Sequence, residues 1–221
     1  MNAYFISGLG ADRRIFSKIK LDERIDIIHV DWITPLKNES LVSYAKRLSE
    51  IIDTDKPYVL VGVSFGGMIA VEISKILNPL LTIAISSTIL SYELPVLYRL
   101  AGKLSLIKLI PSSLIKSSNR FSQNFFFGTK SIEEKTLLSR IISDTDPKFL
   151  KWAIVSILEW RNTIRPDRLY HIHGTKDKIL YSKAKPDFSI QNGTHFMVYQ
   201  NAKEISGIID KLVLNLPPKT S

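Results

Sequence analysis

Short apolar segments of strand type alternate along this chain with segments of helical periodicity, and this alternation limits the fold more than any other feature. The expected strands end near Gly, Asp or Ser and cover residues 3–7, 25–32, 58–63, 80–86, 169–173 and 188–191. Apolar residues at helical spacing mark residues 12–19, 40–52, 65–77 and 202–214. This order predicts an α/β fold, with a mainly parallel sheet of about six strands and helices on both faces.

One long segment interrupts the alternation. Residues 89–160 contain no clear strand, but helical patterns occur at 96–109, 132–142 and 149–159, with prolines between them. A segment of this length is too long for a simple loop. We therefore expect a helical cap, residues 89–160, inserted into a core that consists of residues 1–88 and 161–221.

A serine stands between two glycines where an expected strand meets an expected helix. Gly62 and Gly66 lie two positions before and after Ser64. A sharp turn from strand to helix crowds and strains the backbone, and small residues relieve the crowding. The N–H groups at the start of the following helix point back at the serine, where they stabilise developing negative charge. The pattern therefore indicates a nucleophilic serine.

A serine nucleophile needs a base and an acid that orients the base. Asp177 follows a Gly turn just beyond the fifth expected strand, and His195 lies in a polar turn before the last helix. Because the carboxyl ends of parallel strands share one edge of a sheet, Ser64, Asp177 and His195 can meet there. Two other carboxylates stay open as the acid: Asp31, which ends the second strand, and Asp187, which precedes the sixth.

The remaining histidines are interpreted as structural residues. His29 and His171 lie within apolar strand segments, and His173 precedes a tight turn that it is expected to brace. No cluster of His, Asp and Glu has the spacing of metal ligands, and residues 8–13 lack the third glycine of a dinucleotide-binding loop. No metal and no nucleotide cofactor is therefore expected.

Three motifs together resemble the α/β-hydrolase family, and the resemblance extends over nearly the whole chain. They are Gly62-Val63-Ser64-Phe65-Gly66-Gly67, His173-Gly174-Thr175-Lys176-Asp177 and Gly193-Thr194-His195-Phe196, in the family's order of Ser, Asp and His. The resemblance implies that Ser64 is the nucleophile, that His195 is the general base and then the general acid, and that Asp177 fixes the imidazole tautomer.

The resemblance also places an oxyanion hole in the loop after the first strand, at residues 7–12. Its implied donors are the backbone N–H groups of Leu9 and Phe65. Many family members have His-Gly where this chain has Ser7-Gly8. The conformation of this loop is therefore the point at which the chain departs from the family pattern.

The expected function is hydrolysis of a carboxylic ester with a small or medium acyl group, through an acyl-enzyme. Apolar residues of the cap, with Phe126 and Trp152 as candidates, are expected to line the acyl pocket. The alternatives are a thioesterase for acyl-carrier or acyl-CoA thioesters, a lyase or cofactor-free peroxidase that uses the same three residues, and a catalytically silent binding protein.

The net charge of +9 raises the question of an anionic partner. The basic residues are scattered singly or in pairs, as at Arg13-Arg14, with no basic run and no nucleic-acid-binding module. We therefore expect a small-molecule ester or thioester and no nucleic acid, with an acidic carrier protein as the less favoured partner. No apolar run is long enough to span a membrane and no signal-peptide pattern is present, so a cytoplasmic location is expected.

Overall fold

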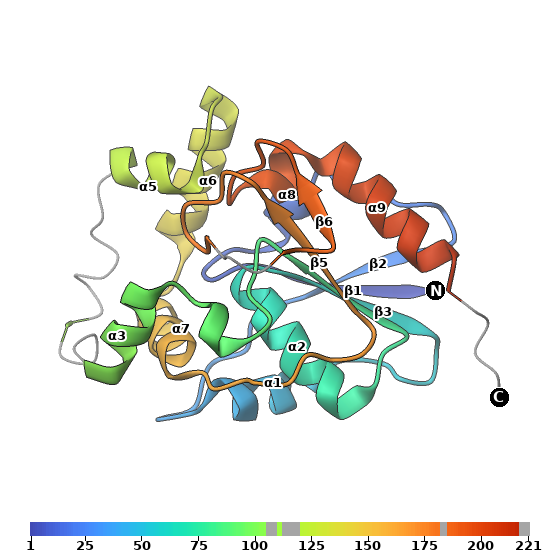
Figure 1. Ribbon diagram of the computed structural model, residues 1–221, viewed down its shortest axis with the longest axis horizontal. Helices are drawn as coiled ribbons and strands as arrows, with labels where there is room; N and C mark the ends of the chain where they lie inside the picture. Colours follow the sequence, from blue (N-terminus) through green and yellow to red (C-terminus); the bar gives the residue numbers. More distant parts are fainter. Residues whose placement is uncertain (105–109, 112–119, 182–184, 217–221) are drawn as a thin grey trace.

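The computed structural model describes residues 1–104, 110–111, 120–181 and 185–216, and it confirms the α/β fold expected from the sequence (Figure 1). The described residues form six strands, which are all parallel and make one sheet in the order β2-β1-β3-β4-β5-β6. Each strand lies within two residues of its expected ends: β1 (Asn2–Ile6), β2 (Asp26–Val30), β3 (Tyr58–Val63), β4 (Leu81–Ile85), β5 (Leu169–Gly174) and β6 (Phe188–Ile190).

The side chains of the central strands alternate between two core layers. In β1, Tyr4 and Ile6 pack in the layer that α1 (Leu41–Ser49) and α2 (Phe65–Leu77) cover, whereas Phe5 packs in the layer that α9 (Ala202–Leu214) covers. Figure 1 shows α1 and α2 on one side of the sheet and α9 on the other. β1, β3 and β4 are buried along their whole length, as is usual for parallel strands that are covered on both faces.

The register of the sheet aligns the ends of neighbouring strands. Ile6, the last residue of β1, lies opposite Val30 of β2 and Gly62 of β3. The loop after β1 therefore begins beside the turn after β3. This alignment determines which backbone groups surround Ser64.

The core helices match the expected ones in three cases of four. α2 and α9 have the expected bounds, and α1 begins after Ser40, whose hydroxyl accepts a hydrogen bond from the Ser43 N–H (3.1 Å). The helix expected over residues 12–19 is instead a single 3₁₀ turn, η1 (Arg13–Phe16). A short helix that was not expected, α8 (Met197–Gln200), precedes α9.

Between β4 and β5 the described residues form helices and no strand. A 3₁₀ turn, η2 (Ser91–Glu93), is followed by α3 (Val96–Leu104), α5 (Arg120–Phe127), α6 (Ile132–Asp144) and α7 (Pro147–Glu159). In Figure 1 these four α-helices gather at the end of the sheet opposite the N-terminus, where the strands have their carboxyl ends. α5 was not expected from the sequence, and residues 105–109 of the helix expected over 96–109 lie outside the described residues.

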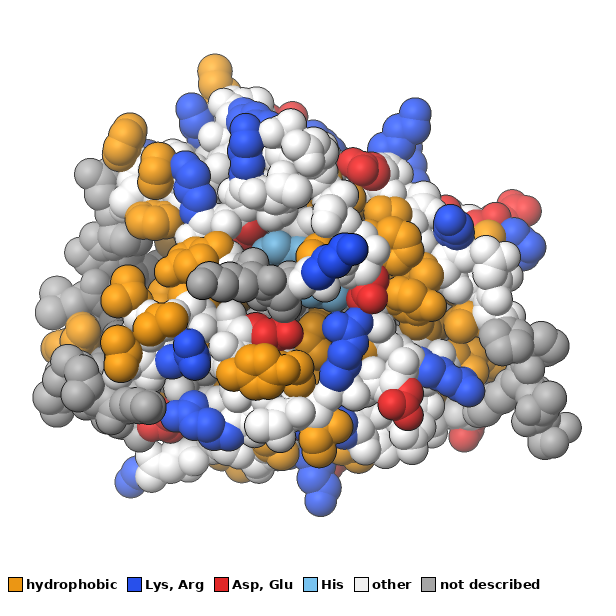
Figure 2. Space-filling view, in the orientation of Figure 1, with side chains coloured by type: hydrophobic (Ala, Val, Ile, Leu, Met, Phe, Trp, Pro, Cys, Tyr) orange, Lys and Arg blue, Asp and Glu red, His pale blue; other side chains and the backbone are white. Residues whose placement is uncertain are grey.

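The charged surface is mixed rather than continuous. On the face shown in Figure 2, Lys and Arg side chains are dispersed among hydrophobic and uncharged atoms. Among the helices of the described residues, none combines the length and the apolar character that crossing a bilayer demands. The cytoplasmic location stays a prediction.

Candidate active site

Ser64 occupies the turn that joins β3 to α2, and its backbone is strained. Its φ of 53° and ψ of −119° lie in a region that residues other than glycine rarely adopt. Two hydrogen bonds hold this conformation: the Ser64 N–H donates to the Ile85 carbonyl (2.9 Å), and the Ser87 hydroxyl donates to the Ser64 carbonyl (2.7 Å). The turn therefore presents the Ser64 side chain beyond the end of the sheet.

The glycines around Ser64 are required by close backbone contacts. A Cβ atom on Gly66 would lie 2.1 Å from the carbonyl oxygen of Ser7, and a Cβ atom on Gly62 would lie 2.3 Å from the carbonyl oxygen of Gly66. Real Cβ atoms essentially never approach other atoms so closely. The spacing that marked Ser64 in the sequence thus results from β1, β3 and α2 meeting at one point.

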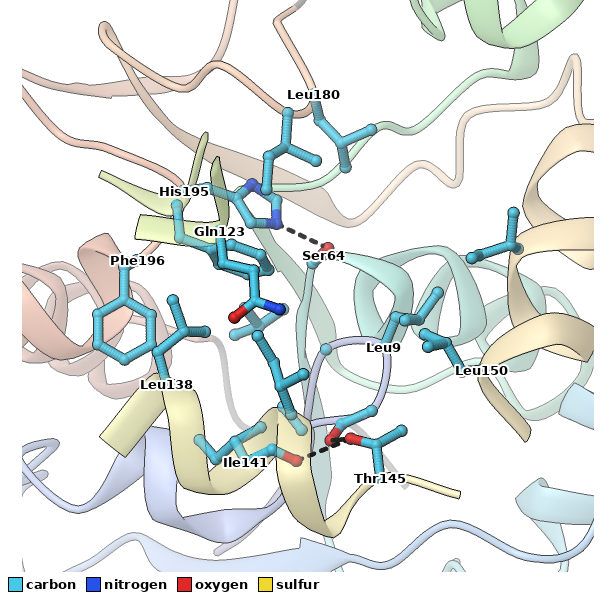
Figure 3. A pocket seen from close by; sticks show the side chains of 18 of the residues that line it. Leu9, Ser64, Gln123, Leu138, Ile141, Thr145, Leu150, Leu180, His195 and Phe196 are labelled. Carbon is cyan, nitrogen blue, oxygen red and sulfur yellow. Dashed lines mark hydrogen bonds between the residues drawn. The ribbon is translucent and has the colours of Figure 1, made fainter. Parts of the chain in front are cut away.

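The structure brings together the three residues named from the sequence. The hydroxyl of Ser64 lies 3.0 Å from Nε2 of His195, and Nδ1 of His195 lies 2.7 Å from Oδ2 of Asp177 (Figure 3). A carboxylate only accepts, so Nδ1 carries the proton of the neutral ring and Nε2 is free to accept the serine proton. The base and the acid of these contacts are both buried: His195 and Asp177 are each 6% exposed.

Asp177 is held as a carboxylate by its surroundings. Burial alone raises its pKa, but the charge interaction and hydrogen bond with His195 outweigh burial and lower the pKa to about 2. Its second oxygen, Oδ1, accepts hydrogen bonds from the backbone N–H groups of Ile179 (2.8 Å) and Leu180 (2.9 Å). Asp177 is therefore ionised and fixed in orientation at neutral pH.

The two alternative acids lie elsewhere. Asp187 accepts hydrogen bonds from the Arg165 guanidinium (2.6 Å) and from the His171 backbone N–H (2.7 Å). Asp31 is exposed immediately after β2. Of the three carboxylates considered, the structure places only Asp177 against His195.

The loop after β1 passes directly beside Ser64. A Cβ atom on Gly8 would lie 3.4 Å from the Ser64 Cβ atom, so the Gly8–Leu9 backbone faces the nucleophile. Phe65 is the first residue of α2, where helix geometry leaves the N–H without an acceptor inside the helix. Of the two positions named as oxyanion donors, Leu9 directly follows Gly8 and lines the same cavity as Ser64, and Phe65 directly follows Ser64.

Three side chains hold this loop in place. The Ser7 hydroxyl and the Trp32 indole N–H both donate to the carbonyl of Ala11, at 2.7 and 2.9 Å. The Thr145 hydroxyl donates to the carbonyl of Gly10 (2.7 Å). Ser7 thus orients the loop at the position where many α/β-hydrolases have His. Trp32 and Thr145 were not identified from the sequence, because they are distant in sequence from the loop.

A cavity of about 470 Å³ opens beside Ser64 and His195 (Figure 3). Helices α3, α5, α6 and α7 all contribute to its wall, together with the loops that follow the strands. None of the described residues that line it is Asp, Glu, Lys or Arg, and most are aliphatic. The aliphatic and aromatic lining residues of the four helices are Tyr98, Ala101, Phe127, Leu138, Ile141, Ile142, Leu150, Ile154, Ile157 and Leu158.

The two pocket residues expected from the sequence do not line this cavity. Phe126 is half exposed, and its neighbour Phe127 faces the cavity instead, because successive helical residues point about 100° apart. Trp152 lies on the other side of α7 from Leu150 and Ile154. Its ring packs on Tyr44 with centroids 4.3 Å apart, and its N–H donates to the backbone.

Helix α6 connects the two loops that carry the site. At its N-terminal end, the preceding turn contacts the His195 loop: the Phe196 N–H donates to the Phe127 carbonyl (3.2 Å), and Gln200 donates to the Gly128 carbonyl (3.0 Å). At its C-terminal end, Thr145 bonds to the loop after β1. The segment from Phe127 to Thr145, which contains α6, therefore extends from one loop to the other.

Two more buried histidines lie behind Asp177. Nε2 of His171 lies 3.0 Å from the carbonyl oxygen of Ser87 and 3.1 Å from Nδ1 of His173. Burial, as the largest cause, lowers the pKa of His171 to about 4 and also lowers the pKa of His173. Both rings are therefore neutral near pH 7. Within the part of the chain that the structure describes, no three His, Cys, Asp or Glu side chains are grouped to hold a metal ion.

Comparison with known proteins identifies the fold. No protein-family model matches the sequence, and no curated protein is similar to it. Solved structures are similar: an esterase from Exiguobacterium antarcticum gives a TM-score of 0.74 at 16% identity, over 97% of this chain and 92% of that chain. A putative lipase from Acinetobacter baumannii gives 0.72 at 16% identity, over 97% and 84% of the two chains.

A bromoperoxidase from Bacillus anthracis is also similar, with a TM-score of 0.69 at 14% identity, over 97% of this chain and 92% of that chain. These neighbours are α/β-hydrolases. The chain therefore has the α/β-hydrolase fold, which the motifs around Ser64, Asp177 and His195 had indicated.

Replacing Gly66 tests the close contact at the Ser64 turn. Gly66→Ala places a methyl group against backbone that cannot move independently, so we expect a loss of about 4 kcal/mol or more in the free energy of unfolding. The matched control is Gly207→Ala in α9, where an added Cβ meets nothing within 4 Å. This variant should gain about 0.5–1 kcal/mol. Urea unfolding measures the free energy of unfolding of both variants. Equal stability of the two would contradict the close backbone contact at Gly66.

The buried His171 predicts a loss of stability in mild acid. Its pKa is about 4 in the folded protein and close to the ordinary 6.5 in the unfolded chain. The folded state thus binds fewer protons between these values, so stability is full above about pH 6.5 and falls as the pH drops toward 4. At pH 5 the loss from His171 is about 2 kcal/mol.

Urea unfolding of the wild type and His171→Gln at about pH 7.5 and about pH 5 checks this. The variant should lose less of its free energy of unfolding between the two pH values, whatever its starting stability. A control variant at the exposed His29, His29→Gln, should keep most of the wild-type change in the free energy of unfolding. An identical pH dependence of stability in the wild type and His171→Gln would show that protonation of His171 does not cause the loss of stability in acid.

Proposed function

We propose that this protein is a serine hydrolase that cleaves carboxylic esters of small or medium acyl groups through an acyl-enzyme. The observation that carries the proposal is the line of contacts from Ser64 to His195 (3.0 Å) and from His195 to Asp177 (2.7 Å), at the edge of an apolar cavity. Strain at a nucleophile turn, a buried base and an ionised acid are the features that serine hydrolysis requires.

In the proposed reaction the Ser64 hydroxyl attacks the ester carbonyl carbon while Nε2 of His195 takes its proton. The carbonyl oxygen becomes an oxyanion, which the backbone N–H groups of Leu9 and Phe65 stabilise. His195 then donates the proton to the departing alkoxide, and the acyl group stays on Ser64. Water attacks the acyl-enzyme with His195 as base, which releases the acid. Asp177 stabilises the positively charged imidazolium of His195 during both formation and hydrolysis of the acyl-enzyme.

The helices between β4 and β5 set the size of the acyl group. We assign residues 89–160 as a cap over the core of residues 1–88 and 161–221. The cavity volume of about 470 Å³ lies in the range of small-molecule sites, and its lining favours an uncharged apolar acyl chain. Because Glu134 of α6 is bonded to Gln200 of α8 and Thr145 at the end of α6 is bonded to the loop after β1, we expect the wall that α6 forms to limit the chain length.

Ser64→Ala should lower kcat by several powers of ten while the protein keeps its fold. Asp177→Asn should lower kcat by on the order of 10⁴, because an amide favours the wrong imidazole tautomer. Hydrolysis of p-nitrophenyl butyrate and labelling by a fluorophosphonate probe measure these effects, and circular dichroism checks the fold.

Asp31→Asn and Asp187→Asn are the matched controls for the acid, and both should keep near wild-type kcat. If Asp187→Asn is the more damaging variant, the acid has been assigned wrongly. Labelling of Ser64 without turnover of any ester would indicate a different reaction, as the bromoperoxidase among the structural neighbours illustrates for this fold.

The limited volume of the cavity, about 470 Å³, predicts an optimum in acyl length. In the series acetate, butyrate, hexanoate, octanoate, laurate, palmitate, kcat/KM should rise and then fall. Ile154→Phe fills part of the cavity and should move the optimum to a shorter chain, because Ile154 lines the wall. The control is Val155→Phe, on the adjacent position that faces a separate groove, which should leave the optimum unchanged.

A comparison of two salt concentrations tests the thioesterase alternative, for which the net charge of +9 leaves room. Turnover of an acyl group on an acidic carrier protein should weaken steeply with salt, and that of a neutral ester should not. If turnover of both substrates responds equally to salt, an acidic carrier protein is excluded as the partner. A preference for palmitate emulsions would contradict the hypothesis that the cavity limits the acyl chain to small or medium length.

A further inference from the structure

His173 stands in an unusual place for a residue that only braces a turn. It comes from the end of β5, is 7% exposed, and its ring lies directly behind the acid of the site. Its Nε2 atom is buried without a hydrogen-bond partner among the described residues, yet it lies 3.7 Å from Oδ2 of Asp177. This is the same oxygen that accepts the hydrogen bond from His195.

The neighbours of His173 determine where its proton lies. The Ser87 carbonyl can only accept, so Nε2 of His171, 3.0 Å away, carries a proton. Nδ1 of His173 lies 3.1 Å from that protonated nitrogen and must therefore be the unprotonated one. A neutral imidazole has one ring proton, so in His173 it is on Nε2. The buried N–H group of His173 thus lies 3.7 Å from Oδ2 of Asp177 and also beside the backbone of Leu180.

Asp177 has room for this N–H. Oδ1 accepts two backbone N–H groups, and Oδ2 accepts one N–H from His195, so three of about four acceptor positions are used. His173 faces the remaining one. At 3.7 Å the contact is longer than a hydrogen bond, but in a buried site the N–H dipole still stabilises the carboxylate.

The same network reaches the nucleophile. The Ser87 carbonyl accepts from His171, while the Ser87 hydroxyl donates to the backbone carbonyl of Ser64 (2.7 Å). Ser87 follows β4, which lies between the strands that carry Ser64 and Asp177. A second path of buried polar contacts therefore runs from the Ser64 turn through Ser87, His171 and His173 to Asp177, separate from the path through His195.

We propose that His173 is a positioning residue for the acid: its Nε2–H orients the Asp177 carboxylate and shares its charge, with His171 and Ser87 fixing the ring. The expected effect on kcat rests on the proposed hydrolase function. His173 touches no substrate. It acts by keeping Oδ2 aligned with Nδ1 of His195, so its loss affects the chemical step rather than binding.

Two replacements separate positioning from space-filling. His173→Leu keeps an apolar side chain in the buried site and removes the N–H, whereas His173→Gln keeps an amide N–H donor. With p-nitrophenyl butyrate, His173→Leu should lower kcat about 10- to 100-fold with KM nearly unchanged, and His173→Gln should recover much of this loss. If the two variants are equally slow, the donor is irrelevant and the proposal is wrong.

A double-mutant cycle tests whether His173 acts through Asp177. In the Asp177→Asn background, His173→Leu should cause no further loss of kcat, because the carboxylate that it orients is gone. Equal fold-losses in both backgrounds would overturn the proposal. Melting temperatures of all variants check that the comparison is made on folded protein.

A measurement without substrate keeps this test separate from the proposed reaction. The proton on Nδ1 of His195, which is hydrogen-bonded to Asp177, is followed as a downfield ¹H NMR resonance. In His173→Leu it should exchange faster with water and shift, whereas His29→Gln, on an exposed position of β2, should leave it unchanged. An unchanged resonance in His173→Leu would overturn the proposal, even if the wild type hydrolyses no ester.

Discussion

The close contact between Gly66 and the end of β1 is the constraint on which the rest of the site depends. With no side chain at Gly66, α2 approaches the carbonyl oxygens of Ile6 and Ser7 so closely that a single methyl group would not fit. This contact brings the loop after β1 against Ser64 and sets the direction in which α2 leaves the turn. The strained backbone of Ser64, which costs about 1–3 kcal/mol, persists because these surroundings allow no other conformation.

Loops at the end of a sheet are ordinarily its most mobile parts, and here the inserted helices hold them. The turn at Gly128, just before α6, accepts a hydrogen bond from Gln200 of α8, which follows the His195 loop, and Thr145 at the end of α6 donates to the loop after β1. The two loops come from opposite ends of the chain, so the sheet alone does not fix the distance between them. The helices between β4 and β5 therefore help to hold the loops of the site and also line its cavity.

Much of this arrangement was predictable because local rules govern it. Ser64, Asp177 and His195 each follow a strand in a glycine-containing turn, and parallel strands bring such turns to one edge. Residues 125–127 are three consecutive phenylalanines, and only the rotation of α5 decides that Phe127, rather than the expected Phe126, lines the cavity. Trp32 and Thr145 could not be found, because their bonds to residues 10 and 11 join segments that the sequence does not show to be neighbours.

The distribution of charge connects the site to the proposed substrate. The chain carries a net charge of +9, yet the described lining of the cavity has no charged side chain, and His171 and His173 behind Asp177 are held neutral by burial. Surface charges act over about 8 Å at physiological ionic strength, so they influence how a substrate arrives more than how it is held. A carboxylate on the acyl chain would lose its hydration in the cavity and find no described cation there. In the proposed hydrolysis, selection among acyl groups therefore depends on apolar contact and length, while Asp177 and His195 supply the ion pair that this reaction needs.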